Sequence, residues 1–253
     1  KKGLIKLDNL PTTTATFVQG GQLISIQQDV NVKTQRQLIL PLKVVFEDDY
    51  LAIIEKPAGI LVSGNSFKTV DNALAQNLQL SALPDACRPR PVHRLDFPTT
   101  GLLLVGKTTS AIAALNQLFE LKIIQKRYLA ICIGEMEQHG FINEPVDGKP
   151  AQSNYKKLTS LKSERFNFLN LLLLQPVTGR RHQLRKHLAA IGHEILGERE
   201  YGKPEFLLKG KGLYLHAFSL EFTHPHSGNE IHIQSEIPER FEKIFGFNYS
   251  LEA

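Results

Sequence analysis

The chain has 253 residues, 42% of them apolar, which is enough for one large domain or one domain with a small appendage. The formal net charge of +5 and the pI of about 9.1 fit a nucleic-acid partner, although many unrelated proteins share such an excess. The composition excludes a disulfide framework and a membrane helix, because Cys87 and Cys132 lack C-x-x-C spacing and no run reaches roughly 18 apolar residues. We expect a cytoplasmic protein with reduced thiols, and the first residues lack the apolar core of a signal peptide.

The first 28 residues predict two short strands, in GLIKLDNLP and GGQLISIQQ, joined by a loop. Two such strands cannot bury a core of their own, so this segment needs a larger unit to pack against. Residues 29–41 follow as a linker that ends at Pro41. The main domain is expected over residues 42–253.

The main domain begins with strong strand and helix patterns. KVVFEDDYLAIIEKPAG predicts a hairpin, TVDNALAQNL predicts a helix with Thr69 as its N-cap, and LLLVGK predicts a buried strand. TTSAIAALNQLFELKII then predicts a helix capped by Thr109, and KRYLAICIG predicts a strand.

The second half continues in the same way. FNFLNLLLLQPVTG predicts a long strand, followed by a helix in HQLRKHLAAIG that Gly192 ends. LYLHAFSLEFTHPHSGNEIHIQSEIP predicts a hairpin turning at residues 226–229, and ERFEKIFG predicts a short closing helix. Strands outweigh helices, and hairpins imply antiparallel pairing. We therefore expect an α+β fold with a mixed, mostly antiparallel central sheet flanked by helices.

One carboxylate stands among several cations in RPVHRLDFPTTGLLLVGKT, residues 90–108. Asp96 lies near Arg90, His93 and Arg94, at the entrance to the buried strand. A carboxylate in such a place is partly desolvated and stays charged only if a cation supports it. Arg94 would point to the same side as Asp96 if the segment is extended. An isolated Arg-x-Asp is more often a structural ion pair or an Asx-type turn that leads into Pro98.

A second cluster lies in TGRRHQLRKHLAAIGHEILGEREYG, residues 178–202. It begins at a strand-to-helix turn, where backbone N–H groups and the helix dipole favour anions. Leu184 and Leu188 are one turn apart and are expected to face the sheet. A basic helix that is merely solvated remains an alternative, and the histidines lack the spacing of H-E-x-x-H, so we expect no metal site. The basic residues of this cluster are Arg180, Arg181, His182, Arg185, Lys186 and His187.

The third feature is IIQKRYLAICIG, in which Tyr128 follows Lys126 and Arg127 within an apolar strand. A tyrosine in a strand most often packs in the core or against a neighbouring strand. It can also offer a flat surface on which a nucleic-acid base stacks. The residue by itself leaves both interpretations open.

Together these segments resemble the RluA-type family of RNA pseudouridine synthases. The resemblance rests on HRLDFPTTGLLLVGK, FELKIIQKRYLAICIG and GRRHQLRKHLAAIGHEILGEREYG, and also on YLAIIEKPAGILV and LHAFSLEFTHPHSG. It covers roughly residues 42–245 in the right order. The chain has Thr100 where the family usually has Ser, and Arg181 where it usually has Thr.

The resemblance implies a pseudouridine synthase-like catalytic domain that isomerises uridine in RNA to pseudouridine after base flipping, without cofactor or metal. Asp96 would be the catalytic carboxylate, attacking C6 of the base or C1′ of the sugar, or supporting a glycal-type route. Tyr128 would stack on the base and could assist proton removal, and Arg185 would keep Asp96 charged and oriented. Arg94 would fill the gap that the flipped uridine leaves. The expected RNA-binding residues are Arg94, His93, Arg90, Arg180, Arg181, His182, Lys126 and Lys186.

Residues 1–28 resemble the last part of the alpha-L RNA-binding module that often precedes this domain, without its two basic helices. The expected partner is structured RNA, ribosomal rather than transfer RNA, with no membrane and no metal, and the protein is expected to be a monomer. Two other functions stay open. One is an RNA-binding or ribosome-assembly factor on the same fold. The other is a glycoside hydrolase with Glu55 or Asp71 as its second acid.

Overall fold

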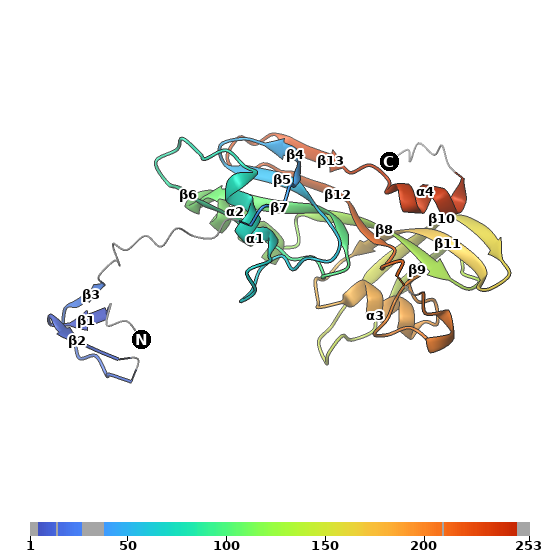
Figure 1. The fold of residues 1–253 in the computed structure, drawn as a ribbon, viewed down its shortest axis with the longest axis horizontal. Coiled ribbons are helices and arrows are strands. Elements are labelled where there is room, and N and C mark those ends of the chain that lie inside the picture. The colour runs from blue at the N-terminus through green and yellow to red at the C-terminus, as the bar shows by residue number, and fades with distance from the viewer. Residues whose placement is uncertain (1–4, 14, 27–37, 209, 247–253) are drawn as a thin grey trace. The chain divides into compact units, whose positions relative to one another are not determined.

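The protein is described here by a computed structural model, which covers residues 5–13, 15–26, 38–208 and 210–246. The chain divides into two compact units, residues 1–37 and 38–253. Most of the predicted linker, residues 29–37, lies outside the described residues. The second unit carries all of the predicted site residues. Its strands and helices, β4 to α4, are labelled in Figure 1.

The first unit contains a three-stranded antiparallel sheet in the order β2-β1-β3. The sequence predicts two strands, but the first segment forms a hairpin of its own. Asp8 and Asn9 take positive φ angles of 49° and 66°, which Asp and Asn tolerate better than most residues, and they turn the chain. The strands are β1 (Ile5–Leu7), β2 (Leu10–Pro11) and β3 (Ile24–Ile26).

A ten-stranded sheet forms the frame of the second unit and runs in the order β4-β5-β7-β12-β8-β11-β10-β9, with β6 beside β7 and β13 beside β12. All of its strand pairs are antiparallel except β7–β12, which confirms the predicted mixed, mostly antiparallel fold. The strands are β4 (Lys43–Glu47), β5 (Leu51–Lys56), β6 (Ala86–Pro91), β7 (Thr100–Thr108), β8 (Gln125–Ile133), β9 (His139–Ile142), β10 (Ser153–Ser163), β11 (Asn167–Pro176), β12 (Leu215–Thr223) and β13 (Glu230–Gln234).

Four α-helices of the described chain flank this sheet: α1 (Val70–Ala73), α2 (Thr109–Glu120), α3 (Gln183–Ala190) and α4 (Glu239–Phe245). The predicted cap of α1 is confirmed, since the Thr69 hydroxyl accepts a hydrogen bond from the N–H of Asn72. The predicted cap of α2 is wrong by one residue. Thr108 is the cap, because its Oγ1 accepts from the N–H of Ala111 at 3.1 Å, and Thr109 is already helical.

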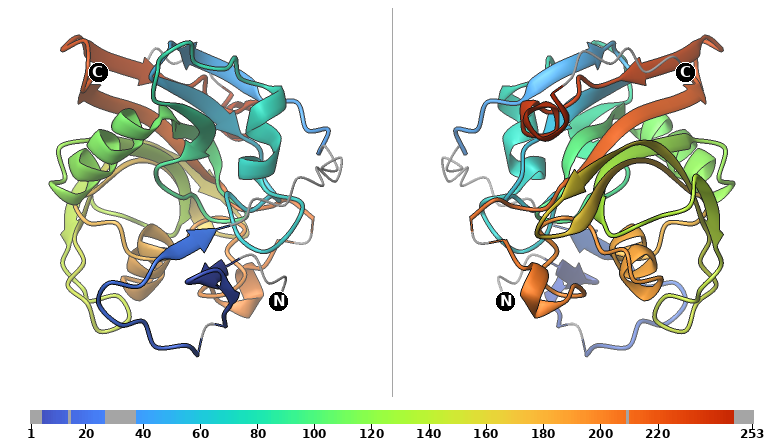
Figure 2. Two further views of the ribbon diagram at one scale, coloured as in Figure 1. Left: turned by 90° about the vertical axis from the view of Figure 1, so that its left-hand side faces the viewer. Right: turned by 90° about the vertical axis from the view of Figure 1, so that its right-hand side faces the viewer.

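Leu184 and Leu188 of α3 are buried in one apolar cluster with residues of β8 and β11, as their spacing predicts. Figure 2 shows these strands curving over the helix. Apolar packing therefore fixes the position of α3, and the side chains on its other faces are available for polar contacts.

Strand register aligns four positions across the sheet. Gly101 of β7 pairs with Ala217 of β12, Ala217 pairs with Tyr128 of β8, and Tyr128 pairs with Leu174 of β11. The start of β7, which follows the Asp96 loop, is therefore separated from Tyr128 by a single strand, β12. The end of β11, which leads into α3, lies on the other side of Tyr128.

Candidate active site

The loop that carries Asp96 is held by a buried lysine. Lys56, at the end of β5, is 1% exposed, and its Nζ donates to the carbonyl groups of Pro57, Phe97 and Thr99 at 2.8, 3.2 and 2.8 Å. Burial lowers the pKa of Lys56 to about 8, and the charge of Asp96 opposes this shift. The ammonium group therefore ties the backbone at Phe97 and Thr99, directly after Asp96, to the end of β5.

Arg185 enters the site from α3, and its principal partner is a glutamate that the sequence reasoning missed. Its Nε and Nη2 donate to the two carboxylate oxygens of Glu198 at 2.8 and 2.7 Å, and the two side chains are 3% and 0% exposed. Burial alone would raise the pKa of Glu198, but hydrogen bonds from Arg185 and from backbone N–H groups outweigh it and lower that pKa. The expected burial of Arg185 was the clue to this glutamate, because a buried guanidinium requires a carboxylate partner.

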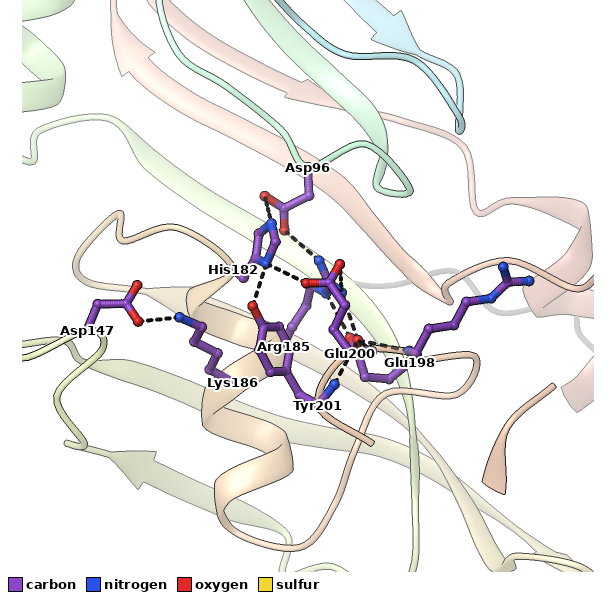
Figure 3. Close-up of polar contacts among 9 residues, drawn as sticks. Asp96, Asp147, His182, Arg185, Lys186, Glu198, Glu200 and Tyr201 are labelled. Carbon is purple, nitrogen blue, oxygen red and sulfur yellow. Dashed lines mark hydrogen bonds and ion pairs between the residues drawn. The ribbon is translucent and has the colours of Figure 1, made fainter. Parts of the chain in front are cut away.

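Asp96 lies at the other end of the same guanidinium. Its Oδ2 is 3.9 Å from Nη1 of Arg185, which is an ion-pair distance but longer than a hydrogen bond. Nη1 is buried and has no hydrogen-bond partner within the described chain. The bidentate pair with Glu198 thus orients the guanidinium so that Nη1 points towards Asp96 (Figure 3).

His182, expected among the RNA contacts, faces the same carboxylate. It stands just before α3 with a left-handed φ of 56°. Its Nε2 is 3.7 Å from Oδ1 of Asp96, while its Nδ1 lies 2.8 Å from the hydroxyl of Tyr201 and 3.5 Å from Glu200 (Figure 3). Burial lowers the pKa of His182, and the charges of Arg185 and Arg181 lower it further, against the opposing charge of Asp96. The strained backbone brings the imidazole into the site.

The turn between β11 and α3 is fixed by Gln183, which is buried. Its side-chain oxygen accepts from the hydroxyl of Thr178 and from the N–H of Arg180, and its amide nitrogen donates to Gln152 and Ser153. The turn that presents the predicted basic residues is therefore anchored to β10 rather than loose.

Tyr128 is half-buried in β8 and lines the cavity that contains Asp96. Burial raises its pKa, and the nearby charge of Asp96 raises it further. At neutral pH the side chain is therefore a phenol, which offers an aromatic face and one hydroxyl donor.

This cavity has a volume of about 500 Å³ and unites most of the predicted site residues. Arg90 and Lys186 do not line it. Arg90 lies in β6 with an exposed side chain, and the Nζ of Lys186 is 2.6 Å from Asp147 (Figure 3). The predicted residues that line it are His93, Arg94, Asp96, Lys126, Tyr128, Arg180, Arg181, His182 and Arg185.

His93 lines the cavity but carries no charge there. Its Nε2 accepts a hydrogen bond from the N–H of Leu104 at 2.9 Å, and burial, with the charge of Lys126, lowers its pKa to about 3. Its ring lies 4.8 Å from that of Phe119. His93 therefore joins the loop to β7 as a neutral imidazole.

The second acid needed by a glycoside hydrolase is not where the sequence reasoning sought it. Glu55 accepts from Ser235 and pairs with Lys43, Asp71 pairs with Arg88, and neither acid lines the cavity. Within the described residues, no group of three or more His, Cys, Asp or Glu side chains is placed to hold a metal ion. No helix of the described part is long and apolar enough to cross a membrane.

Known proteins match both the sequence and the fold. A sequence model of the family described as RNA pseudouridylate synthase matches residues 50–190. The ribosomal large subunit pseudouridine synthase D of Nitrosomonas europaea is 36% identical over 93% of this chain and 74% of its own length. Synthase C of Yersinia pestis is 35% identical over 82% and 69%. The solved structure of human RNA pseudouridylate synthase domain containing 1 is 25% identical, with a TM-score of 0.62, over 78% of this chain and 84% of its own.

Proposed function

The chain belongs to the RNA pseudouridylate synthase family, and on that premise we propose that it isomerises uridines of ribosomal RNA, with Asp96 as the reacting carboxylate. The names of the similar proteins support the ribosomal substrate. One observation supports Asp96 above all. Its carboxylate is 15% exposed in a cavity, with Nη1 of Arg185 at 3.9 Å and Nε2 of His182 at 3.7 Å. A cytoplasmic location and a monomeric state stay predictions.

The substrate must leave the RNA stack before Asp96 can reach it. Extruding a nucleotide costs a few kcal/mol, and contacts made only in the flipped state offset this cost. Arg94 is exposed at the cavity. It follows His93, which accepts a hydrogen bond from Leu104 of β7. Its guanidinium is therefore available to occupy the space that the uridine leaves, while Tyr128 stacks on the extruded base.

The reaction breaks the bond between N1 and C1′ and forms a bond between C5 and C1′, and C5 loses a proton to water while N1 takes one up from water. The atoms balance without an oxidant, a reductant or a second substrate. Asp96 acts as a nucleophile at C6 or C1′, or as the base of a glycal-type route. In each case the guanidinium of Arg185 stabilises the carboxylate while it is charged.

The test is release of tritium from 5-tritiated uridine in a transcript of large-subunit ribosomal RNA. We expect release by the native chain and none above background by Asp96→Asn, which preserves shape and removes the charge. Asp96→Asn should unfold at the same temperature as the native chain and bind the transcript equally well. Release by Asp96→Asn would remove Asp96 from the mechanism. RNA binding by the native chain without release on ribosomal or transfer RNA would indicate an assembly factor instead.

A further inference from the structure

The backbone of Thr99, which follows Asp96 by three residues, is held by two hydrogen bonds. Its N–H donates to the carbonyl of Asp96 at 3.1 Å, and its own carbonyl accepts from Nζ of Lys56 at 2.8 Å. The residue is 2% exposed and lines the same cavity as Asp96. Its side chain therefore lies at a fixed place beside the reacting carboxylate.

The fold gives the hydroxyl of Thr99 no hydrogen-bond partner among the described residues, and Oγ1 is buried. A buried hydroxyl without a partner is costly, and valine would fill the same volume without that cost. The neighbouring Thr100 shows the usual situation, because its Oγ1 lies 2.8 Å from Nδ1 of His216.

The position of Thr99 limits what its hydroxyl can meet. Asp96 acts at or next to the glycosidic bond, so a group on the same loop faces the part of the nucleotide around C1′. The ribose 2′-hydroxyl is on the adjoining carbon and, like a threonine hydroxyl, both donates and accepts. Rotation about Cα–Cβ moves the hydroxyl of Thr99 to another staggered position and breaks no hydrogen bond that the described structure contains.

We propose that Thr99 is a substrate-binding residue whose hydroxyl hydrogen-bonds the ribose 2′-hydroxyl of the flipped uridine, so that this contact selects RNA over DNA. The inference rests on the proposed function, because it needs a flipped nucleotide next to Asp96. It assigns the unpartnered hydroxyl a partner in the substrate complex. It also explains why the free protein tolerates the cost of burying that group.

The test measures equilibrium binding in the Asp96→Asn background, where chemistry does not disturb the complex. The probe is a synthetic RNA stem-loop from which the native chain releases tritium at a single labelled uridine, with uridine or 2′-deoxyuridine at that position alone. Thr99→Val removes the hydroxyl at constant volume, and Thr99→Ser keeps it. Thr12→Val is the matched control, because Thr12 also has a buried hydroxyl without a described partner but does not line the cavity.

We expect Thr99→Val to weaken binding of the uridine RNA about 5- to 10-fold, and Thr99→Ser and Thr12→Val to change it less than twofold. The deoxyuridine RNA should bind Asp96→Asn 5- to 10-fold more weakly as well, with no further loss in Thr99→Val. The thermal midpoint of Thr99→Val should not fall, because no hydrogen bond is lost.

Equal binding of the two RNAs by Asp96→Asn would overturn the inference, whatever the Thr99 variants do. If the losses from the deoxy substitution and from Thr99→Val were additive, the ribose 2′-hydroxyl would contact a group other than Thr99. That result would overturn the inference too. Failure of the proposed function shows separately, since it is measured as absent tritium release by the native chain.

Discussion

At the scale of single residues, the site depends on how one guanidinium is shared. Glu198 takes the two short hydrogen bonds of Arg185, and Asp96 receives only the longer approach of Nη1. This division fits the proposed role of Asp96, because a carboxylate locked in two strong hydrogen bonds would be a weak nucleophile. Under that proposal Glu198 is a positioning residue, and Asp96 is the group that reacts.

The pair of Arg185 and Glu198 should dominate local stability. Arg185→Ala should lower the free energy of unfolding by about 3–5 kcal/mol, because it leaves the buried Glu198 charged and without its cation. Glu198→Ala should cost less, because Nη2 of Arg185 keeps Glu200 at 3.1 Å. The double variant should lose clearly less than the sum of the two. Denaturant unfolding of the four proteins measures this coupling. Lys186→Ala is the control, because its partner Asp147 is on the surface, and additive losses would contradict the coupling.

The pH dependence of stability follows from the lowered pKa of Glu198. An acid whose pKa is lower in the folded state stabilises the fold fully above its unfolded pKa, about 4.5 for Glu, and loses that contribution as pH falls through the folded value. Stability of the native chain should therefore fall below pH ~4.5. Glu198→Gln should be less stable at pH 7 and show a shallower fall. The check is the free energy of unfolding between pH 7 and pH 3, and parallel curves would exclude Glu198 as the source.

At the scale of elements, the contact between β7 and β12 brings the parts of the site together. Their parallel pairing spans only two residues on each strand, Thr100–Gly101 and His216–Ala217. Gly101 has a φ of +110°, and a Cβ there would lie 2.2 Å from the carbonyl oxygen of Ala217. Glycine is required both for this backbone conformation and for the close approach of the strands.

Gly101→Ala should therefore push β7 away from β12 and separate the Asp96 loop from Tyr128. We expect a large loss of stability, on the order of 3 kcal/mol or more, and a loss of tritium release that exceeds the unfolded fraction. Gly20→Ala is the control, because nothing lies within 4 Å of its added Cβ. Denaturant unfolding and the tritium assay under native conditions test both parts, and a stable, active Gly101→Ala would refute the close approach.

At the scale of the whole molecule, the excess of five positive charges matters through its placement. The cavity with Asp96 is bordered by cations from three separate segments: Arg94 from the β6–β7 loop, Lys122 and Lys126 near the start of β8, and Arg180 and Arg181 before α3. Lys186 is paired with Asp147 and lies outside the cavity. A polyanion is therefore attracted to the opening of the site.

RNA affinity should consequently fall steeply with salt. On a plot of log affinity against log salt, Arg181→Ala should reduce the magnitude of the slope by about 1, because one phosphate contact is lost. Lys186→Ala should leave the slope unchanged. Filter binding of the ribosomal transcript between 50 and 300 mM salt compares them. Equal slopes for the native chain and Arg181→Ala would remove Arg181 from the RNA contacts.

Much of the fold was predictable because its strongest signals are local. The apolar runs of β7, β8 and β11 identify strands that are buried, and the predicted hairpins and the cap of α1 are confirmed. β6, β9 and β10 were missed. β6 contains two prolines, β10 is mostly polar with a bulge after Lys157, and β9 is a four-residue edge strand, so none shows a clear alternation.

The sequence by itself determined the class of fold and the residue types proposed to carry the chemistry, since apolar periodicity and chemical character belong to each segment alone. It singled out Asp96, Tyr128 and Arg185, and the structure brings all three to one cavity. Only the tertiary structure decided that Glu198 holds Arg185, that Lys56 holds the Asp96 loop, and that Thr99 keeps a hydroxyl without a partner. Such pairings depend on strand order and register, which bring distant segments together and which no local pattern encodes.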